Sequence, residues 1–139
     1  MRARWIAGIG MAAFFALFAS TGIYAQERQE QKHEHHWDNQ HPQFDDHERE
    51  VARGWAEKHH DHPVVGFRTE DRLSADLDGR LVVGFTLDND WRRRVHPVPE
   101  DLMVDLPAPP PGYRYYVIGG HVVLVDRGWR VADVINVNL

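Results

Sequence analysis

The chain has 139 residues, no cysteine and a formal net charge of −5 at pH 7, with 21 acidic side chains against 16 lysines and arginines. The acidic excess argues against nucleic acid as a partner, because binding to a phosphate backbone needs a basic surface. Without cysteine there are no disulfides and no thiolate metal sites, so a hydrophobic core must hold the fold.

The N-terminal 25 residues have the pattern of a signal peptide. Arg2 and Arg4 stand next to the start, and residues 6–18 form a short apolar stretch. Ala25 precedes the expected cleavage site. The alternative is an uncleaved membrane anchor, since the uncharged run is long enough to span a bilayer. The short apolar core favours cleavage, so we expect export to the periplasm, with membrane contact only if this segment stays uncleaved.

Residues 26–62 are dominated by charged and polar side chains. Such a segment buries too little apolar surface to offset its ordering entropy, so we expect its first half to be disordered. Asp45 followed by Glu48 is typical of a capping box, and apolar residues then recur at helical spacing. The pattern predicts an amphipathic helix from about Asp46 to His60.

Residues 63–139 combine β-prone runs with turn signals and are predicted to form a separate small module. Gly119 and Gly120 are typical of a two-residue hairpin turn between strands at 113–118 and 121–126, and a third strand is expected at 130–135. Residues 64–67 and 81–85 are further β-prone runs. The predicted fold class is α+β: a small antiparallel β meander of three to five strands with one buried face, preceded by one amphipathic helix and a disordered His-rich segment.

Histidine is the strongest chemical signal, since eight of the ten histidines lie between positions 33 and 62. Neutral imidazole suits nickel, cobalt, copper and zinc ions. We therefore predict that the segment binds a divalent transition-metal ion, weakly and with little selectivity, because a flexible chain must be ordered around the ion. No cofactor is required. The predicted ligands are His33, His35, His36, His41, His47, His59, His60 and His62.

Two other interpretations of these histidines stay open. In one they only keep a polar tract soluble. In the other they form a pH sensor, because an imidazole with a pKa of about 6.5 changes its charge as the compartment acidifies. Outside the tract, His96 and His121 are expected at the surface.

The C-terminal module also contains aromatic and basic side chains that could contact a partner. Some of the aromatic residues around the predicted meander must be exposed, so a binding face is one interpretation and core packing is the other. The basic run at 92–94 is interpreted as a solvated turn, with an anionic lipid or polysaccharide contact as the alternative. The aromatic residues are Trp91, Tyr113, Tyr115, Tyr116 and Trp129.

An enzymatic function is not predicted. Ser74 is the only serine after position 25, and there is no cysteine, so a nucleophilic triad has almost no candidate nucleophile. No glycine-rich phosphate loop and no His-Glu-x-x-His pattern occurs.

The C-terminal half resembles a known family. Its signature is LPAPPPGYRY at 106–115, preceded by VPEDL at 98–102 and followed by the GGHVVLVD hairpin at 119–126. Together with the signal peptide and the His-rich tract, this pattern resembles the RcnB-like family of small periplasmic proteins, and it is also similar to a related family of short exported proteins of unknown function. The resemblance implies a periplasmic, non-enzymatic protein that influences nickel and cobalt levels.

The leading hypothesis from the sequence is therefore a periplasmic protein of nickel and cobalt homeostasis. Residues 33–62 would bind the metal, and the module from position 63 would dock to an envelope protein partner. The alternative is a non-enzymatic envelope interaction protein whose histidines are incidental or act as a pH sensor.

Overall fold

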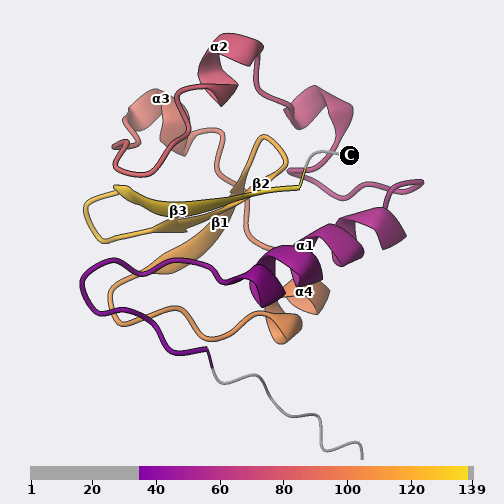
Figure 1. The fold of residues 1–139 in the computed structure, drawn as a ribbon. Helices are drawn as coiled ribbons and strands as arrows, with labels where there is room; N and C mark the ends of the chain where they lie inside the picture. The colour runs from indigo at the N-terminus through magenta and orange to yellow at the C-terminus, as the bar shows by residue number, and fades with distance from the viewer. Residues whose placement is uncertain (1–34, 138–139) are drawn as a thin grey trace, which may run out of the picture. The chain divides into compact units, whose positions relative to one another are not determined.

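The last third of the chain forms a three-stranded antiparallel sheet in the order β1-β2-β3 (Figure 1). The structure, a computed structural model, describes residues 35–137, and the predicted signal peptide and His33 lie outside the described residues. The sheet and four helices confirm the α+β class. The elements are α1 (Asp46–Lys58), a 3-10 turn (Thr69–Asp71), α2 (Ala75–Asp78), α3 (Asn89–Arg92), α4 (Glu100–Asp105), β1 (Arg114–Ile118), β2 (His121–Val125) and β3 (Val131–Asn136).

The hairpin between β1 and β2 turns at the two glycines, as predicted. Gly119 and Gly120 have φ angles of 58° and 81°, which both residues of a tight type I′ turn require. Ile118 consequently pairs with His121 across the turn, and this register continues to Arg114 opposite Val125.

Both faces of the sheet are covered, so the expectation of a single buried face was wrong. All five residues of β2 are buried. Val122 and Leu124 pack into the cluster that includes residues of α1 and α4, whereas Val123 and Val125 pack into a second cluster with Trp91 of α3. Figure 1 shows α1 and α4 on one side of the sheet, and α2 and α3 on the other. The physical reason is that β2 is a nearly continuous apolar run and not an alternating one, so it places apolar side chains on both faces of the sheet, and both faces must be shielded from water.

The two other β-prone runs form turns instead of strands. Gly66 and Gly84 have φ angles of 96° and 90°, a conformation that interrupts a regular strand. Within residues 35–137, additional strand-like pairing consists of two isolated bridges, Thr86 with Arg130 and His96 with Val117. The sheet therefore has the smallest of the predicted strand numbers.

Helix α1 begins with the capping box that the sequence predicts. The Asp45 side chain accepts a hydrogen bond from the Glu48 backbone N–H at 3.1 Å, and Glu48 Oε2 accepts one from the Asp45 backbone N–H at 2.7 Å. The helix ends at Lys58, two residues before the predicted end. None of the helices in residues 35–137 has the length and apolar character needed to cross a membrane.

Residues 35–44, ahead of α1, pack on the sheet, whereas residues 26–34, the rest of the half that we expect to be disordered, lie outside the described residues. Trp37 Nε1 donates to the Ala108 carbonyl at 2.8 Å, and the Phe44 ring stacks on Tyr115 with 5.7 Å between ring centres. The Phe44 backbone N–H also donates to Asp133 Oδ2 at 2.8 Å. Two aromatic residues thus supply apolar contact that the polar composition of the tract does not indicate. Residues 35–62 consequently belong to the same compact unit as the sheet.

Candidate metal centre

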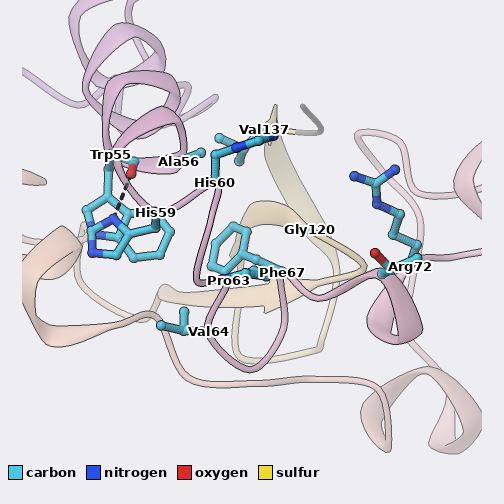
Figure 2. A pocket seen from close by; sticks show the side chains of 11 residues that line it. Trp55, Ala56, His59, His60, Pro63, Val64, Phe67, Arg72, Gly120 and Val137 are labelled. Atoms are coloured by element: carbon cyan, nitrogen blue, oxygen red, sulfur yellow. Dashed lines mark hydrogen bonds between the residues drawn. The ribbon is translucent and has the colours of Figure 1, made fainter.

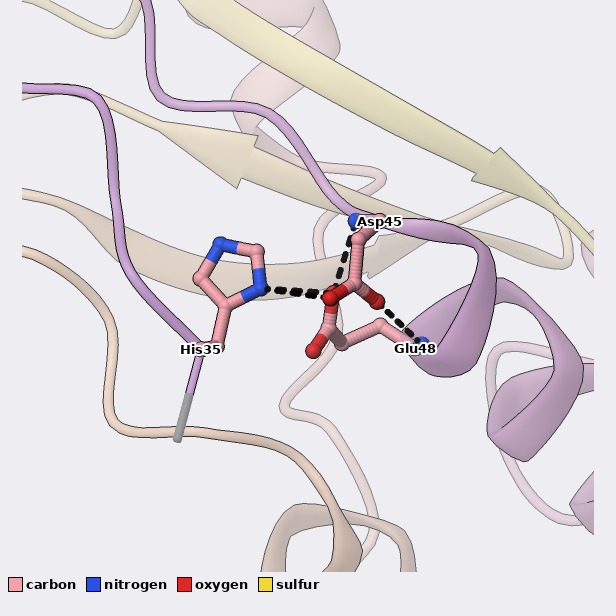
Figure 3. Close-up of side chains that lie close together, drawn as sticks. All are labelled: His35, Asp45 and Glu48. Atoms are coloured by element: carbon pink, nitrogen blue, oxygen red, sulfur yellow. Dashed lines mark hydrogen bonds and ion pairs between the residues drawn. The ribbon is translucent and has the colours of Figure 1, made fainter. Parts of the chain in front are cut away.

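Three potential metal ligands converge at the start of α1: His35, Asp45 and Glu48 (Figure 3). His35 Nδ1 lies 3.2 Å from Asp45 Oδ2 and 2.9 Å from Glu48 Oε2. One ligand atom from each side chain lies within 4.8 Å of the other two. One imidazole nitrogen and two carboxylate oxygens are a donor set suited to divalent transition metals.

The capping box positions the two carboxylates of this cluster. Asp45 Oδ1 accepts a hydrogen bond from the Glu48 backbone N–H, and the other oxygen, Oδ2, faces His35. Glu48 Oε2 accepts from the Asp45 backbone N–H and also faces the imidazole. Glu48 Oε1 is buried and has no hydrogen-bond partner within residues 35–137. The helix start therefore holds one carboxylate that is only half satisfied.

Burial gives this cluster unusual electrostatics. The Glu48 residue is 1% exposed, the His35 side chain 5% and the Asp45 side chain 38%. Burial raises the pKa of the Glu48 carboxyl, and the Asp45 side chain raises it further, whereas the hydrogen bond from the Asp45 backbone N–H and the nearby His35 oppose the shift. Burial also raises the pKa of the nearby Tyr115 hydroxyl, and the charge of Glu48 adds to that shift. A negative Glu48 therefore needs a compensating cation beside it.

The distances between His35 Nδ1 and the two carboxylate oxygens fit either a proton or a metal ion as the cation beside Glu48. Ligand atoms bound at about 2.1 Å and at right angles to each other lie about 3 Å apart. The N–O separations of 2.9 and 3.2 Å are close to that value, and they equally fit hydrogen bonds donated by a protonated Nδ1. A bound ion would therefore take the place of the Nδ1 proton, with small movement of the side chains.

An open hollow beside the cluster brings in two more of the predicted ligands. It has a volume of about 570 Å³, and His36 and His41 line it together with His35, Asp38 and Asp45. Both extra histidines are exposed. They come from the same loop as His35, so they can contribute further nitrogen ligands without movement of the core.

The second dense group of histidines lies at the other end of α1 and does not join this cluster. His59 stacks on Trp55 with 4.2 Å between ring centres, and its Nε2 lies 3.2 Å from an Asp101 carboxylate oxygen. Figure 2 shows these rings at a pocket of about 190 Å³ that His60 also lines. Among the other predicted ligands, His47, His60 and His62 are exposed, and His60 forms an ion pair with its neighbour Asp61 at 3.1 Å. The predicted ligands are thus divided between the two ends of the helix.

Two acidic members of the cluster were not predicted as ligands, and one histidine outside it lies elsewhere than predicted. Asp45 and Glu48 were recognised only as a capping box, although the nearby His35 was a signal for a second role. His121, expected at the surface, is 4% exposed, and its Nε2 lies 2.5 Å from Asp78 Oδ1. The reason is that α2 covers the first residue of β2.

The known proteins compared with this chain show no more than a distant structural similarity. No family model matches the chain. No curated protein matches it either. A distantly similar solved structure is the C-terminal domain of inner membrane protein CigR from Salmonella enterica, which has 24% sequence identity and a TM-score of 0.48. The similarity covers 63% of this chain and 82% of that one. The resemblance to the RcnB-like family therefore stays a prediction from the sequence.

Proposed function

We propose that this chain is an exported periplasmic protein of transition-metal homeostasis that binds a divalent ion with His35, Asp45 and Glu48. The main support for this proposal is the buried Glu48 carboxylate. One of its oxygens lies 2.9 Å from an imidazole nitrogen, and the other has no hydrogen-bond partner among the described residues. Leaving a buried carboxylate half satisfied is costly, and a bound cation removes that cost.

Export and the identity of the metal rest on the sequence. The signal-peptide pattern supports a periplasmic protein, and the RcnB-like signature supports nickel or cobalt. The intrinsic order of divalent ions predicts that copper binds tightest, nickel next and cobalt more weakly. His36 and His41 would complete the coordination from the adjoining hollow.

The test is a calorimetric titration of nickel and cobalt into the protein without its predicted signal peptide. Glu48→Gln is the most informative variant, because glutamine still offers an oxygen to the Asp45 backbone N–H and keeps the capping box while the charge is lost. His60→Gln, at the exposed far end of α1, is the matched control. We expect Glu48→Gln and His35→Gln to weaken binding at least about tenfold, a loss of about 1.4 kcal/mol, and His60→Gln to have no effect. Wild-type affinity in Glu48→Gln would overturn the proposal.

The same cluster also favours the pH-sensor alternative, because His35 Nδ1 contacts two carboxylates. Titrations in buffers of different ionisation enthalpy separate the two functions. Burial raises the pKa of Glu48, so as the pH falls metal binding must displace the proton of this carboxyl, and the measured heat should then change with the buffer. A cluster that titrates with pH but binds none of nickel, cobalt, copper or zinc would leave only the sensor.

A further inference from the structure

The turn between β2 and β3 presents aromatic and basic side chains that the proposed metal site does not use. Tyr116 of β1 stacks on Trp129 of the turn, with 5.3 Å between ring centres and 18° between ring planes. The Arg92 guanidinium of α3 lies 4.9 Å from the centre of the Trp129 ring. Its Nε donates to the Leu87 carbonyl at 3.1 Å, which fixes the arginine in place.

The backbone of Trp129 is in an unfavourable conformation. Its φ angle is 63°, in the left-handed region, and Trp129 is the only non-glycine residue with a positive φ within residues 35–137. Gly128 stands one position earlier, so the chain has a glycine in this turn but not at the strained position. Asp126 Oδ1 secures the turn by accepting the backbone N–H groups of Gly128 at 2.8 Å and Arg130 at 2.9 Å. A bulky ring kept at such a position points to a role for the side chain beyond the hairpin.

A hollow of about 210 Å³ opens beside these two rings. Arg114 and Arg127 line it, both are exposed, and neither forms an ion pair within the part of the chain that the structure describes. The acidic residue in the lining is Asp126, one oxygen of which is already occupied by backbone N–H groups. The hollow is therefore a local basic site on an acidic protein. Its lining residues are Gly112, Arg114, Tyr116, Asp126, Arg127 and Trp129.

We propose that this hollow binds a carboxylate-bearing sugar unit of an envelope polysaccharide. The planar guanidinium groups of Arg114 and Arg127 match a carboxylate geometrically and can donate two hydrogen bonds each. Tyr116 and Trp129 stack on each other and are half-buried, so they offer the hollow the parts of their rings outside the stack, which are rigid and apolar with a polar edge and suit a sugar ring beside its hydroxyl groups. The volume is that of a small ligand and not of an extended protein interface.

The lining favours a glycan over a lipid membrane. Membrane binding at an interface needs aliphatic or aromatic side chains that project outward beside the charges. In this hollow the two rings pack on each other, and the remaining lining is arginine, aspartate and glycine. The site and its ligand are independent of the metal centre, so either proposal can fail alone.

The test measures binding of a short oligogalacturonate by calorimetry, with a neutral galactan oligosaccharide of equal length as the uncharged probe. We expect the acidic oligosaccharide to bind at least tenfold more tightly than the neutral one, and the affinity to fall with added salt. Arg114→Gln and Arg127→Gln should each weaken binding at least tenfold. Arg53→Gln, an exposed arginine on α1, is the matched control and should leave the affinity unchanged.

Trp129→Gly separates binding from folding, because glycine relieves the left-handed backbone while it removes the ring. We expect this variant to stay folded and to lose the oligosaccharide. The proposal is overturned if the acidic probe does not bind at millimolar concentration, if the neutral probe binds equally, or if Arg53→Gln weakens binding as much as Arg127→Gln. Binding only to phosphatidylglycerol vesicles would also overturn it, in favour of a membrane contact.

Discussion

Asp133 of β3 attaches the start of α1 to the sheet, and its removal should destabilise the protein strongly. Its Oδ2 accepts the Phe44 backbone N–H at 2.8 Å and an Arg49 nitrogen at 2.7 Å, and its Oδ1 accepts the Val134 backbone N–H at 2.8 Å. In Asp133→Ala the buried Phe44 N–H loses its acceptor, which costs about 1–3 kcal/mol. The Arg49 side chain is 29% exposed and keeps the Val134 carbonyl as acceptor, so its loss is smaller, about 1 kcal/mol. The expected loss in the free energy of unfolding is about 2–4 kcal/mol.

Urea denaturation measures this loss directly, with Asp76→Ala as the control. Asp76 is exposed on α2, and its replacement should change stability by less than about 0.5 kcal/mol. In a domain of this size, the Asp133→Ala loss corresponds to a fall in Tm of at least about 8 °C. Nickel affinity should also fall, because Asp45 directly follows the released Phe44. A loss below about 1 kcal/mol, or equal losses in both variants, would refute this account of how the cluster is held.

Two glycine substitutions should act in opposite directions in the same urea assay. Gly54→Ala should raise the free energy of unfolding by up to about 1 kcal/mol, because Gly54 is inside α1 and an added Cβ meets nothing within 4 Å. Gly66→Ala should lower it by about 2–4 kcal/mol, because the new Cβ would lie 2.8 Å from Val117 Cγ1 at a φ angle of 96°; the reverse order of the two variants would contradict both predictions. The raised pKa of Glu48 predicts a pH effect in metal-free protein, because this carboxyl ionises at a lower pH in the unfolded chain than in the folded protein. The free energy of unfolding should therefore fall as the pH rises from about 4.5 through the folded-state pKa, and it should stay level above that pKa. Glu48→Gln should remove that fall between pH 4 and 8, and an identical pH slope in both proteins would be the contrary result.

Helix α1 and the three strands could be predicted because their signals are local. The Asp45 and Glu48 pair marks the helix start within four residues, and Gly119-Gly120 fixes the hairpin by backbone conformation alone. The covering of both sheet faces was harder to predict, because it depends on segments that contribute no regular strand.

The candidate site was predicted only in part, and for a related reason. His35 and His59 belong to groups that look equivalent in the sequence, yet only His35 meets two carboxylates. The difference arises because Trp37 and Phe44 fold the preceding loop back against Tyr115, which brings His35 over the helix start. Those contacts join residues far apart in the chain, so no short sequence window contains them.

The contacts that close this loop have a consequence for the order in which the protein can be built. Phe44 bonds to a residue 89 positions later, and Trp37 to one 71 positions later. In a polypeptide that crosses a membrane N-terminus first, the segment around Phe44 emerges early, yet its bond to Asp133 forms only after the last strand, β3, has arrived. The candidate metal centre would then be complete only after the whole domain has been translocated.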